Sequence, residues 1–384
     1  MAVLLWLAGV YLRVPILVAP PLAPFISDEL ALSQTLTGAL TTLPILMLAV
    51  GAMPGSLAIA RIGPRNTLAM AMVIMVIGSA GRGLVPDTFT LMLASAVMGL
   101  GVAMMQPALP ALLPRWLEPH HIAMGSAIYM NGMLMGEFIG AGVTLPVLMP
   151  LFDHSWRATL LAWSLPGLLV AAALFLPRRD LARPVKRAAW LPDWKNPLTL
   201  RIGLLLGLSG SMFFGLNAYM GNLLEQQGRI TMLSEALFWY NIAQVFASLV
   251  MLKMARAWIG RRTLIVISAA LSILGTTGTL FLNGWWFVAS ATLMSFVAGI
   301  LLILLVALPP LLVSSAETGR LSAGTFLVGY TMGFCVPMLG GLIADNTGDP
   351  RHAVMVMVAY AILVFPLAFT LDLKRKASTG PAAF

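Results

Sequence analysis

The chain has 384 residues, of which 59% are hydrophobic and only 10% are charged, and its mean hydropathy is +0.92. About a quarter of the residues of a soluble domain are charged, so these values exclude a soluble globular protein and place most of the surface against lipid. The single cysteine, Cys335, excludes an internal disulfide, and the net charge of +9 would indicate nucleic-acid binding only if the charges gathered on a folded domain.

A helix needs roughly 20 mostly apolar residues to cross a hydrocarbon core of about 30 Å. Twelve such stretches predict twelve membrane-spanning helices, at residues 3–26, 34–60, 66–86, 88–114, 121–150, 157–177, 200–226, 232–258, 263–282, 285–313, 321–345 and 351–372. The charged segment 178–199 separates two sets of six spans. We therefore predict an all-α integral membrane fold with an N-terminal six-helix bundle at 1–177, a cytoplasmic linker at 178–199 and a C-terminal six-helix bundle at 200–384.

The Lys and Arg residues indicate the orientation. With a cytoplasmic N-terminus, eighteen of them fall in inner segments and only Arg157, Arg229 and Arg351 fall in outer ones. Cytoplasmic loops carry an excess of Lys and Arg, so we expect both termini to be cytoplasmic. Topology then accounts for the positive charge, and no nucleic-acid partner is required. The first span starts with few charges and has no small-residue cleavage site before a soluble domain, so we expect a retained helix.

The two sets of six spans repeat each other at a shift of 197 residues. Residues 36–40 align with 233–237, 62–65 with 259–262, and 132–136 with 329–333. Duplicated halves with the same orientation place a substrate path between two bundles near the membrane midplane, with alternating access. Small residues allow close helix packing, and span 5 carries Gly132, Gly136 and Gly140 while span 11 carries Gly329 and Gly333. Their role is either static packing or a sliding interface.

Glycines and basic residues recur at 55–65 and at 99–103 with 114–116. These two segments resemble the major facilitator superfamily, and the resemblance extends over essentially the whole chain. One is residues 55–65, similar to that family's cytoplasmic signature, in which an acidic residue precedes a basic, glycine-containing run. The other is residues 99–103 with 114–116. Ala60 stands where the acidic residue is expected, and Ser95 stands where the family usually has an arginine. The resemblance implies conformational gating loops, to which we assign Gly55, Arg61, Gly63, Arg65, Gly260 and Arg262.

A narrower resemblance is to the cyanate/nitroimidazole (CynX/NimT) transporter branch of that family. The residues that carry it are 12–14, 20–22, 37–44 with the string Thr-Thr-Leu-Pro, Arg82 and 109–110. This resemblance implies small organic or anionic solutes as substrates. In its compactness the chain resembles bacterial inner-membrane proteins, so we expect that location.

Ionisable residues within the predicted spans are candidate functional groups, because each costs about 2.5–3.5 kcal/mol at a helix centre. Arg13, in span 1, presents a fork of donors that suits a planar anion, and it is either a substrate anchor or a structural arginine. Glu137, in span 5, is a candidate proton carrier, a permanent counter-ion to Arg13, or a solvated residue at an outer position. For Arg82, at the end of span 3, we expect snorkelling to the membrane surface.

Uncharged polar residues in the spans supply the rest of a candidate substrate-binding wall. They are Gln106, Tyr129, Asn131, Asn217, Tyr219, Tyr240, Asn241, Gln244 and Tyr330. As a set they suit a small flat solute better than a large lipid. Each of them alone is as well explained by an interhelical hydrogen bond.

The sequence thus predicts a secondary active transporter of a small organic anion or small heterocyclic solute, proton-coupled or uniporting, without cofactor or metal and working as a monomer in the lipid bilayer. A membrane sensor or scaffold without transport and a membrane enzyme are the alternatives. We expect no enzyme, because HExxH and GxSxG are absent and no GxxxxGK[ST] loop offers ATP as the driving force.

Overall fold

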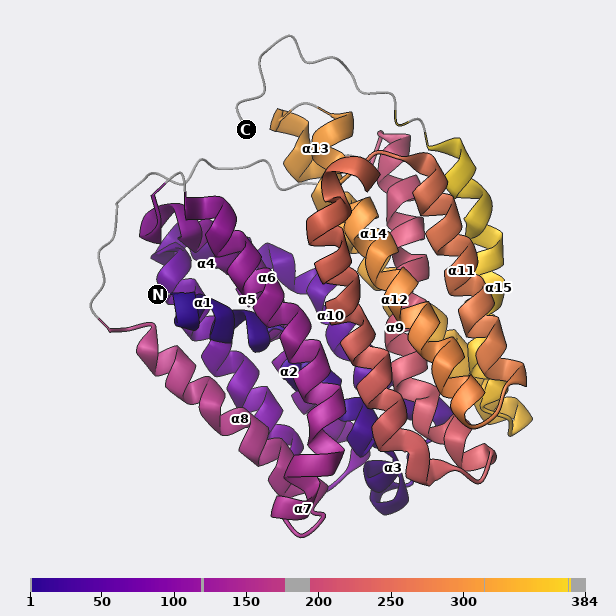
Figure 1. The fold of residues 1–384 in the computed structure, drawn as a ribbon. Coiled ribbons are helices and arrows are strands. Elements are labelled where there is room, and N and C mark those ends of the chain that lie inside the picture. The colour runs from indigo at the N-terminus through magenta and orange to yellow at the C-terminus, as the bar shows by residue number, and fades with distance from the viewer. Residues whose placement is uncertain (1, 119–120, 177–193, 314, 372, 374–384) are drawn as a thin grey trace.

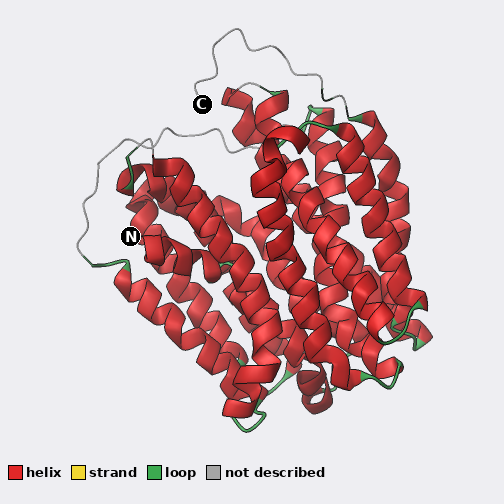
Figure 2. Cartoon of the chain, in the orientation of Figure 1, coloured by secondary structure: helices red, strands yellow, loops and turns green. Residues whose placement is uncertain are grey.

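The computed structural model describes residues 2–118, 121–176, 194–313, 315–371 and 373. These residues form helices joined by short loops, and no strand occurs among them (Figure 2). Twelve helical stretches are long and apolar enough to cross a membrane, as the sequence predicted. Residues 177–193, which include most of the predicted linker at 178–199, lie outside the described residues.

Two groups of helices stand side by side (Figure 1). The N-bundle consists of α1 (Ala2–Val10), α2 (Val14–Leu17), α3 (Ala19–Leu30), α4 (Gln34–Arg82), α5 (Thr88–Trp116), α6 (Ile122–Phe138), the π-helix η2 (Ile139–Leu148), α7 (Met149–Leu151) and α8 (Trp156–Ala173). The C-bundle consists of α9 (Pro197–Gln226), η3 (Ile230–Met232), α10 (Leu233–Trp258), α11 (Arg262–Phe281), α12 (Trp285–Val306), α13 (Pro309–Leu312), α14 (Ser315–Thr347), α15 (Arg351–Val364) and η4 (Phe365–Thr370).

Spans 1 and 5 leave regular α-helical geometry in their middle. Span 1 is divided into α1, α2 and α3, and the first break lies just before Pro15, which has no N–H to continue the helical ladder. The N–H groups of Leu12 and Arg13 bond three residues back, to Gly9 and Val10, as in a 3₁₀ turn. Span 5 changes from α6 to the π-helix η2 at Ile139. A π-helical segment is rare and is often found at functional sites.

The repeat seen in the sequence has a counterpart in the backbone. Gly63, within α4, has φ of 81°, and Gly260, which is 197 residues later, has φ of 84°. Both glycines adopt the left-handed region that other residues rarely occupy, and both allow a sharp turn between two spans. Arg65 donates to the Leu174 carbonyl at 2.6 Å and Arg262 to the Phe369 carbonyl at 2.9 Å. Each bundle thus ties its third span to the end of its sixth in the same way.

The glycines of span 5 bring α6 against the backbone of α1. A Cβ at Gly132 would lie 2.2 Å from the Trp6 carbonyl oxygen, and one at Gly136 would lie 2.3 Å from the Val10 carbonyl oxygen. No larger side chain fits at those distances, so the predicted close approach is confirmed for these two residues.

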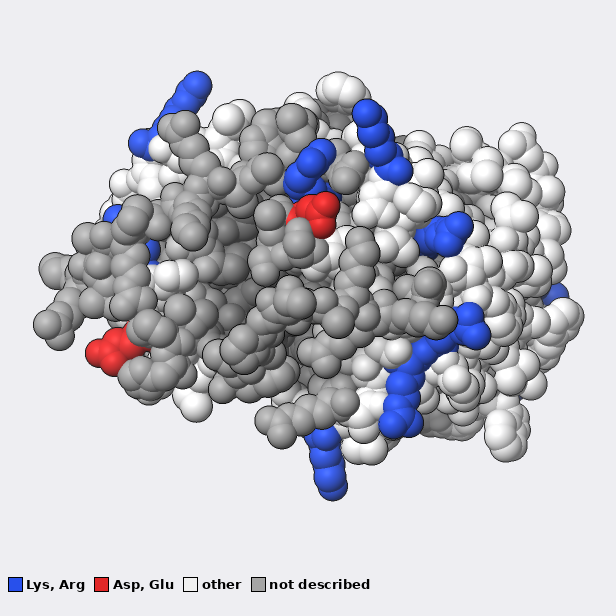
Figure 3. All heavy atoms as spheres, turned by 90° about the horizontal axis from the view of Figure 1, so that it is seen from above, with Lys and Arg blue, Asp and Glu red and all other residues white. Residues whose placement is uncertain are grey.

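The two ends of the molecule differ in charge. The turn at Gly63, the end of α5 and the start of α9 lie at one end with Arg61, Arg65, Arg115 and Arg201, and we call it the basic end. Figure 3 shows this face, with Lys and Arg side chains spread over it and few acidic ones. The opposite end, with the loops after α3, α7 and α9, is called the far end.

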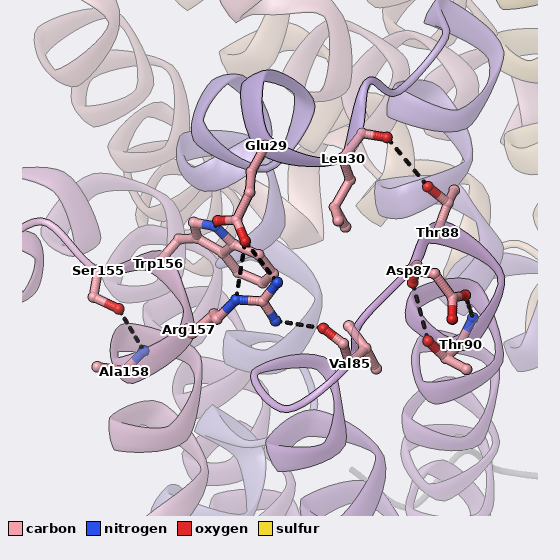
Figure 4. A network of polar contacts seen from close by, with 10 residues as sticks. All are labelled: Glu29, Leu30, Val85, Asp87, Thr88, Thr90, Ser155, Trp156, Arg157 and Ala158. Atoms are coloured by element: carbon pink, nitrogen blue, oxygen red, sulfur yellow. Dashed lines mark hydrogen bonds and ion pairs between the residues drawn. The ribbon is translucent and has the colours of Figure 1, made fainter.

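A polar network fastens the helices of the N-bundle together at the far end (Figure 4). Glu29 accepts hydrogen bonds from Arg157 at 2.7 Å and from the Trp156 indole at 2.7 Å, and Arg157 also donates to the Val85 carbonyl at 2.5 Å. These contacts join α3, α8 and the loop before α5. Side chains thus connect three segments of the N-bundle at this end.

Candidate functional site

A buried ion pair lies inside the N-bundle. The Nε atom of Arg13 donates to Oε1 of Glu137 at 2.9 Å. The residues are 5% and 4% exposed, respectively. Taking two charges out of water costs several kcal/mol for each, and removing one partner of such a pair leaves an uncompensated buried charge.

The local backbone explains why these two side chains meet. Arg13 lies at the break between α1 and α2, with φ of −129° and ψ of −36°, and Glu137 lies one residue before the end of α6. Gly136 packs directly on the carbonyl of Val10, which brings the two irregular helices together at this level. The ion pair therefore joins the two points at which spans 1 and 5 leave regular α-helical geometry.

The ion pair borders the C-bundle. The guanidinium carbon of Arg13 lies 5.9 Å from the centre of the Phe214 ring on α9, at the limit of a cation–π contact. Phe138, next to Glu137, packs edge to face on Phe238 of α10 with ring centres 5.1 Å apart. Both charged residues are thus within one side chain of the interface between the bundles.

The polar candidates of spans 7 and 8 form a separate cluster within the C-bundle. Asn217 and Asn241 exchange amide hydrogen bonds at 3.0 and 3.4 Å, and neither side chain is exposed. The Tyr240 hydroxyl donates to the Phe213 carbonyl at 3.1 Å, and its ring stacks on that of Phe213. Gln244 donates to the Ser295 carbonyl at 3.0 Å. In this conformation these groups bond to one another or to backbone carbonyls. They act as hydrogen bonds between helices, which is one of the two roles the sequence allows.

Two of the other polar candidates link the bundles, and two pack inside the N-bundle. Gln106 of α5 donates to the Tyr330 hydroxyl of α14 at 3.0 Å, which crosses the interface. Asn131 accepts from the Trp6 indole at 3.0 Å, and Tyr129 packs against the hydrophobic core. The Tyr219 hydroxyl of α9 donates to the Pro337 carbonyl of α14 at 2.9 Å. The nine polar candidates thus occupy several places in this conformation.

Arg82 is buried, which makes the expectation of snorkelling wrong. It is 1% exposed, and one of its terminal amino groups donates to the Pro15 carbonyl at 2.6 Å. Its Nε atom has no hydrogen-bond partner among the described residues. The reason lies in span 1, where the carbonyl of Pro15, just after the helix break, accepts a hydrogen bond from the buried guanidinium. Arg82 therefore fastens span 3 to the broken part of span 1.

The bundles are joined at the far end by Asp345, near the end of α14. Its carboxylate accepts from the backbone N–H of Gln34 at 2.5 Å, from that of Thr35 at 2.9 Å, and from the Thr35 hydroxyl. These N–H groups belong to the first turn of α4, where the helix leaves its donors unpaired and favours negative charge. Asn222 of α9 adds a bond to the Gln34 side chain at 2.8 Å. The sequence offered no signal for this clamp beyond an acidic residue at a span end.

The residues that the sequence assigns to gating loops lie at or near the basic end. A Cβ at Gly55 would lie 3.0 Å from both Met104 and Pro107 of α5, so this glycine lets α4 approach α5 closely. Arg61 is exposed at the end of span 2, and a groove of α4 that includes Pro54 and Leu57 leads to it. Within the described residues, no three His, Cys, Asp or Glu side chains gather as metal ligands would.

Known proteins resemble this chain in sequence over most of its length. It is 27% identical over 371 residues to the 2-nitroimidazole transporter of Escherichia coli (strain K12), covering 92% of this chain and 90% of that protein. It is 24% identical over 362 residues to the cyanate transport protein CynX of the same strain, covering 91% of each chain.

Solved structures share the fold. A bacterial homologue of the human lysosomal transporter Spinster, in an inward-facing and occupied conformation, superposes with a TM-score of 0.75 at 15% identity, covering 99% of this chain and 98% of that one. The inward-open xylose transporter XylE from E. coli gives a TM-score of 0.75 at 12% identity over 95% of both chains. The family profile described as Major Facilitator Superfamily matches residues 5–229, more than half of the sequence. With twelve spans in two repeated bundles, the chain belongs to the major facilitator superfamily.

Proposed function

We propose that this protein is a secondary active transporter that carries a small organic anion or small heterocyclic solute across a bacterial inner membrane by alternating access. The basic end faces the cytoplasm, in accord with the distribution of Lys and Arg, and the far end faces the periplasm. The observation that carries the proposal is the buried pair of Arg13 and Glu137 beside the interface of the bundles. The two E. coli relatives, a 2-nitroimidazole transporter and a cyanate transport protein, support this size and class of solute.

Arg13 is the anchor for the substrate in this proposal. A guanidinium holds a planar anion through two parallel hydrogen bonds, which a carboxylate or a nitro group can accept. In the structure, Glu137 binds Arg13 through Nε and occupies part of that donor set. Substrate and Glu137 therefore compete for the same cation.

Glu137 is the proton carrier. When its carboxylate takes up a proton, its attraction to Arg13 is lost and the guanidinium is free to bind the anion. One proton on Glu137 and one negative charge on the substrate leave the net charge of the loaded site unchanged from that of the ion pair. The proposal thus implies symport of one proton with one monovalent anion, in a step that moves no net charge.

An experiment on purified protein tests the binding step. Thermal unfolding in detergent is followed with 2-nitroimidazole, cyanate and imidazole-4-carboxylate, the last of which joins a planar ring to a carboxylate. A bound solute stabilises by mass action, by about 2.7 kcal/mol at one hundred times its dissociation constant. We expect a rise in the unfolding temperature that is lost in Arg13→Gln and kept in Arg201→Gln, a matched arginine whose contact is the Thr370 carbonyl at the basic end.

The outcomes separate the candidate functions. A stabilising solute that remains equally effective in Arg13→Gln would show that the arginine is structural and would move the site to the polar cluster of α9 and α10. A solute that binds and is chemically altered by the purified protein would favour a membrane enzyme. Binding without uptake into proteoliposomes would favour a sensor.

A further inference from the structure

The first turns of α4 form the N-bundle side of the closed far end. Asp345 clamps Gln34 and Thr35, and a Cβ at Gly38 would lie 2.1 Å from the Tyr219 hydroxyl of α9. Two turns further along, Ile45 lies 3.5 Å from the position of a Cβ at Gly333 of α14. The α4 segment between Thr35 and Ile45 is therefore held against the C-bundle at both ends.

Two threonines in this segment have unpaired hydroxyl groups. Thr37 and Thr41 are 1% and 0% exposed, and neither Oγ1 atom has a hydrogen-bond partner among the described residues. Threonines in helices usually bond the carbonyl four residues back, as Thr42 does to Gly38 at 2.9 Å and Thr144 does to Gly140. A buried hydroxyl without a partner is costly, and most buried polar atoms are hydrogen-bonded. The two free hydroxyls in one helical stripe therefore require an explanation.

Their place on the helix indicates what they face. Thr37 and Thr41 are four residues apart and lie on one stripe of α4. Val50, which is 55% exposed, comes nine residues after Thr41, about two and a half turns, and so lies on the opposite side. The hydroxyls thus point away from this exposed side. They share their stripe with Ile45, four residues after Thr41, which contacts α14, and they lie between that contact and the clamp at Asp345.

We infer that Thr37 and Thr41 are the first substrate contacts on the periplasmic side, exposed when the bundles part at the far end. This inference rests on the proposed alternating access. Two side chains one turn apart have Cβ atoms about 5–6 Å from each other, a spacing that suits two polar atoms of one small planar solute. Each hydroxyl donates to an acceptor oxygen such as that of a carboxylate or nitro group. Because hydroxyls carry no charge, they hold an anion loosely and release it toward Arg13.

One experiment tests the exposure without any substrate. Thr37→Cys and Thr41→Cys are made in a Cys335→Ser background and treated from the periplasmic side with a membrane-impermeant thiol reagent. We expect labelling of both, at least fivefold faster when Asp345→Asn releases the clamp, and none for Met75→Cys in the core of the N-bundle. Absence of labelling at both threonine positions in the released protein would overturn the inference, since these side chains would then never face the periplasm.

A second experiment tests the hydroxyls themselves. Influx of imidazole-4-carboxylate into proteoliposomes is compared for Thr37→Val, Thr41→Val and the matched control Thr42→Val, whose hydroxyl is bonded within the helix. We expect a KM raised about fivefold in each of the first two with kcat within twofold, the loss that one hydrogen bond accounts for, and an unchanged KM in the control.

The result distinguishes the inference from the function on which it rests. Valine removes an unpaired hydroxyl without changing the shape of the side chain, so a purely structural role predicts a higher unfolding temperature and an unchanged KM, which would overturn the inference. If the unaltered protein takes up no imidazole-4-carboxylate, the proposed function fails for that class of solute, and the labelling experiment still decides the exposure of the two threonines.

Discussion

Asp345→Asn should open the far end of the protein. The carboxylate accepts three hydrogen bonds from Gln34 and Thr35 at the start of α4, two of them from backbone N–H groups. A charged acceptor at a helix N-terminus contributes about 0.5–2 kcal/mol, and asparagine keeps one acceptor oxygen but loses the charge. Asp345 is exposed, which screens the interaction, so we expect a loss of about 1–2 kcal/mol from the closed form. That loss raises the ratio of open to closed molecules about five- to thirtyfold.

Distances between spin labels at the far end measure this ratio. Leu84, after span 3, and Phe281, at the end of α11, are 70% and 74% exposed and lie on opposite bundles. With both replaced by labelled cysteines and Cys335→Ser, double electron–electron resonance should show a longer distance whose share grows in Asp345→Asn.

Asp349→Asn is the matched control. Asp349 accepts from the Arg351 N–H at 2.8 Å and from the Gln226 amide at 2.9 Å, so its bonds stay within the C-bundle. Partial burial raises the pKa of Asp349, but these hydrogen bonds outweigh it and hold the pKa below its usual value, so the group is ionised at neutral pH. Equal distance distributions in Asp345→Asn, in Asp349→Asn and in the unaltered protein would refute a clamp at Asp345.

Two further substitutions test the packing that surrounds the site. Gly136→Ala should lower stability by about 1–3 kcal/mol or more because its methyl group meets the Val10 carbonyl, whereas Gly210→Ala, with open space at its Cβ, should not. Thermal unfolding measures both, and equal effects would count against close backbone packing at Gly136. Asn217→Leu should cost about 1–3 kcal/mol by leaving the buried amide oxygen of Asn241 without its donor, and adding Asn241→Leu should recover part of it. Strict additivity of the two losses, measured in a double-mutant cycle, would speak against their coupling.

The number of spans could be predicted from the sequence because one physical requirement, about 20 apolar residues for each crossing, dominates a membrane protein. The repeat could also be predicted, since Gly63 and Gly260 stand in the same sequence context, and both have a positive φ that other residues rarely adopt. The division of span 1 at Arg13 was not predicted. Hydropathy reports whether a residue is apolar and not whether its N–H completes a helical bond.

The candidate site could be predicted only in part from the sequence. Arg13 and Glu137 are identifiable because charges are rare within spans, and a counter-ion relation between them is one of the roles that the sequence allows. Their contact depends on Gly136 and on the helix break, which bring spans 1 and 5 together, and no sequence pattern gives that distance. The polar residues of α9 and α10 could not be separated into ligand contacts and interhelical bonds, because an amide serves either purpose. Arg82 was misjudged because its depth depends on the Pro15 carbonyl, a backbone group that sequence alone does not place.

The most direct test of the central proposal compares two transport assays on Glu137→Gln in proteoliposomes with imidazole-4-carboxylate. Counterflow requires only that the loaded site change sides, whereas accumulation against a gradient requires coupling to protons. If Glu137 carries the proton, the variant should keep counterflow, lose accumulation driven by an inward proton gradient, and show no dependence of exchange on pH. Proton-driven accumulation at the level of the unaltered protein would contradict that role and leave Glu137 as a structural partner of Arg13.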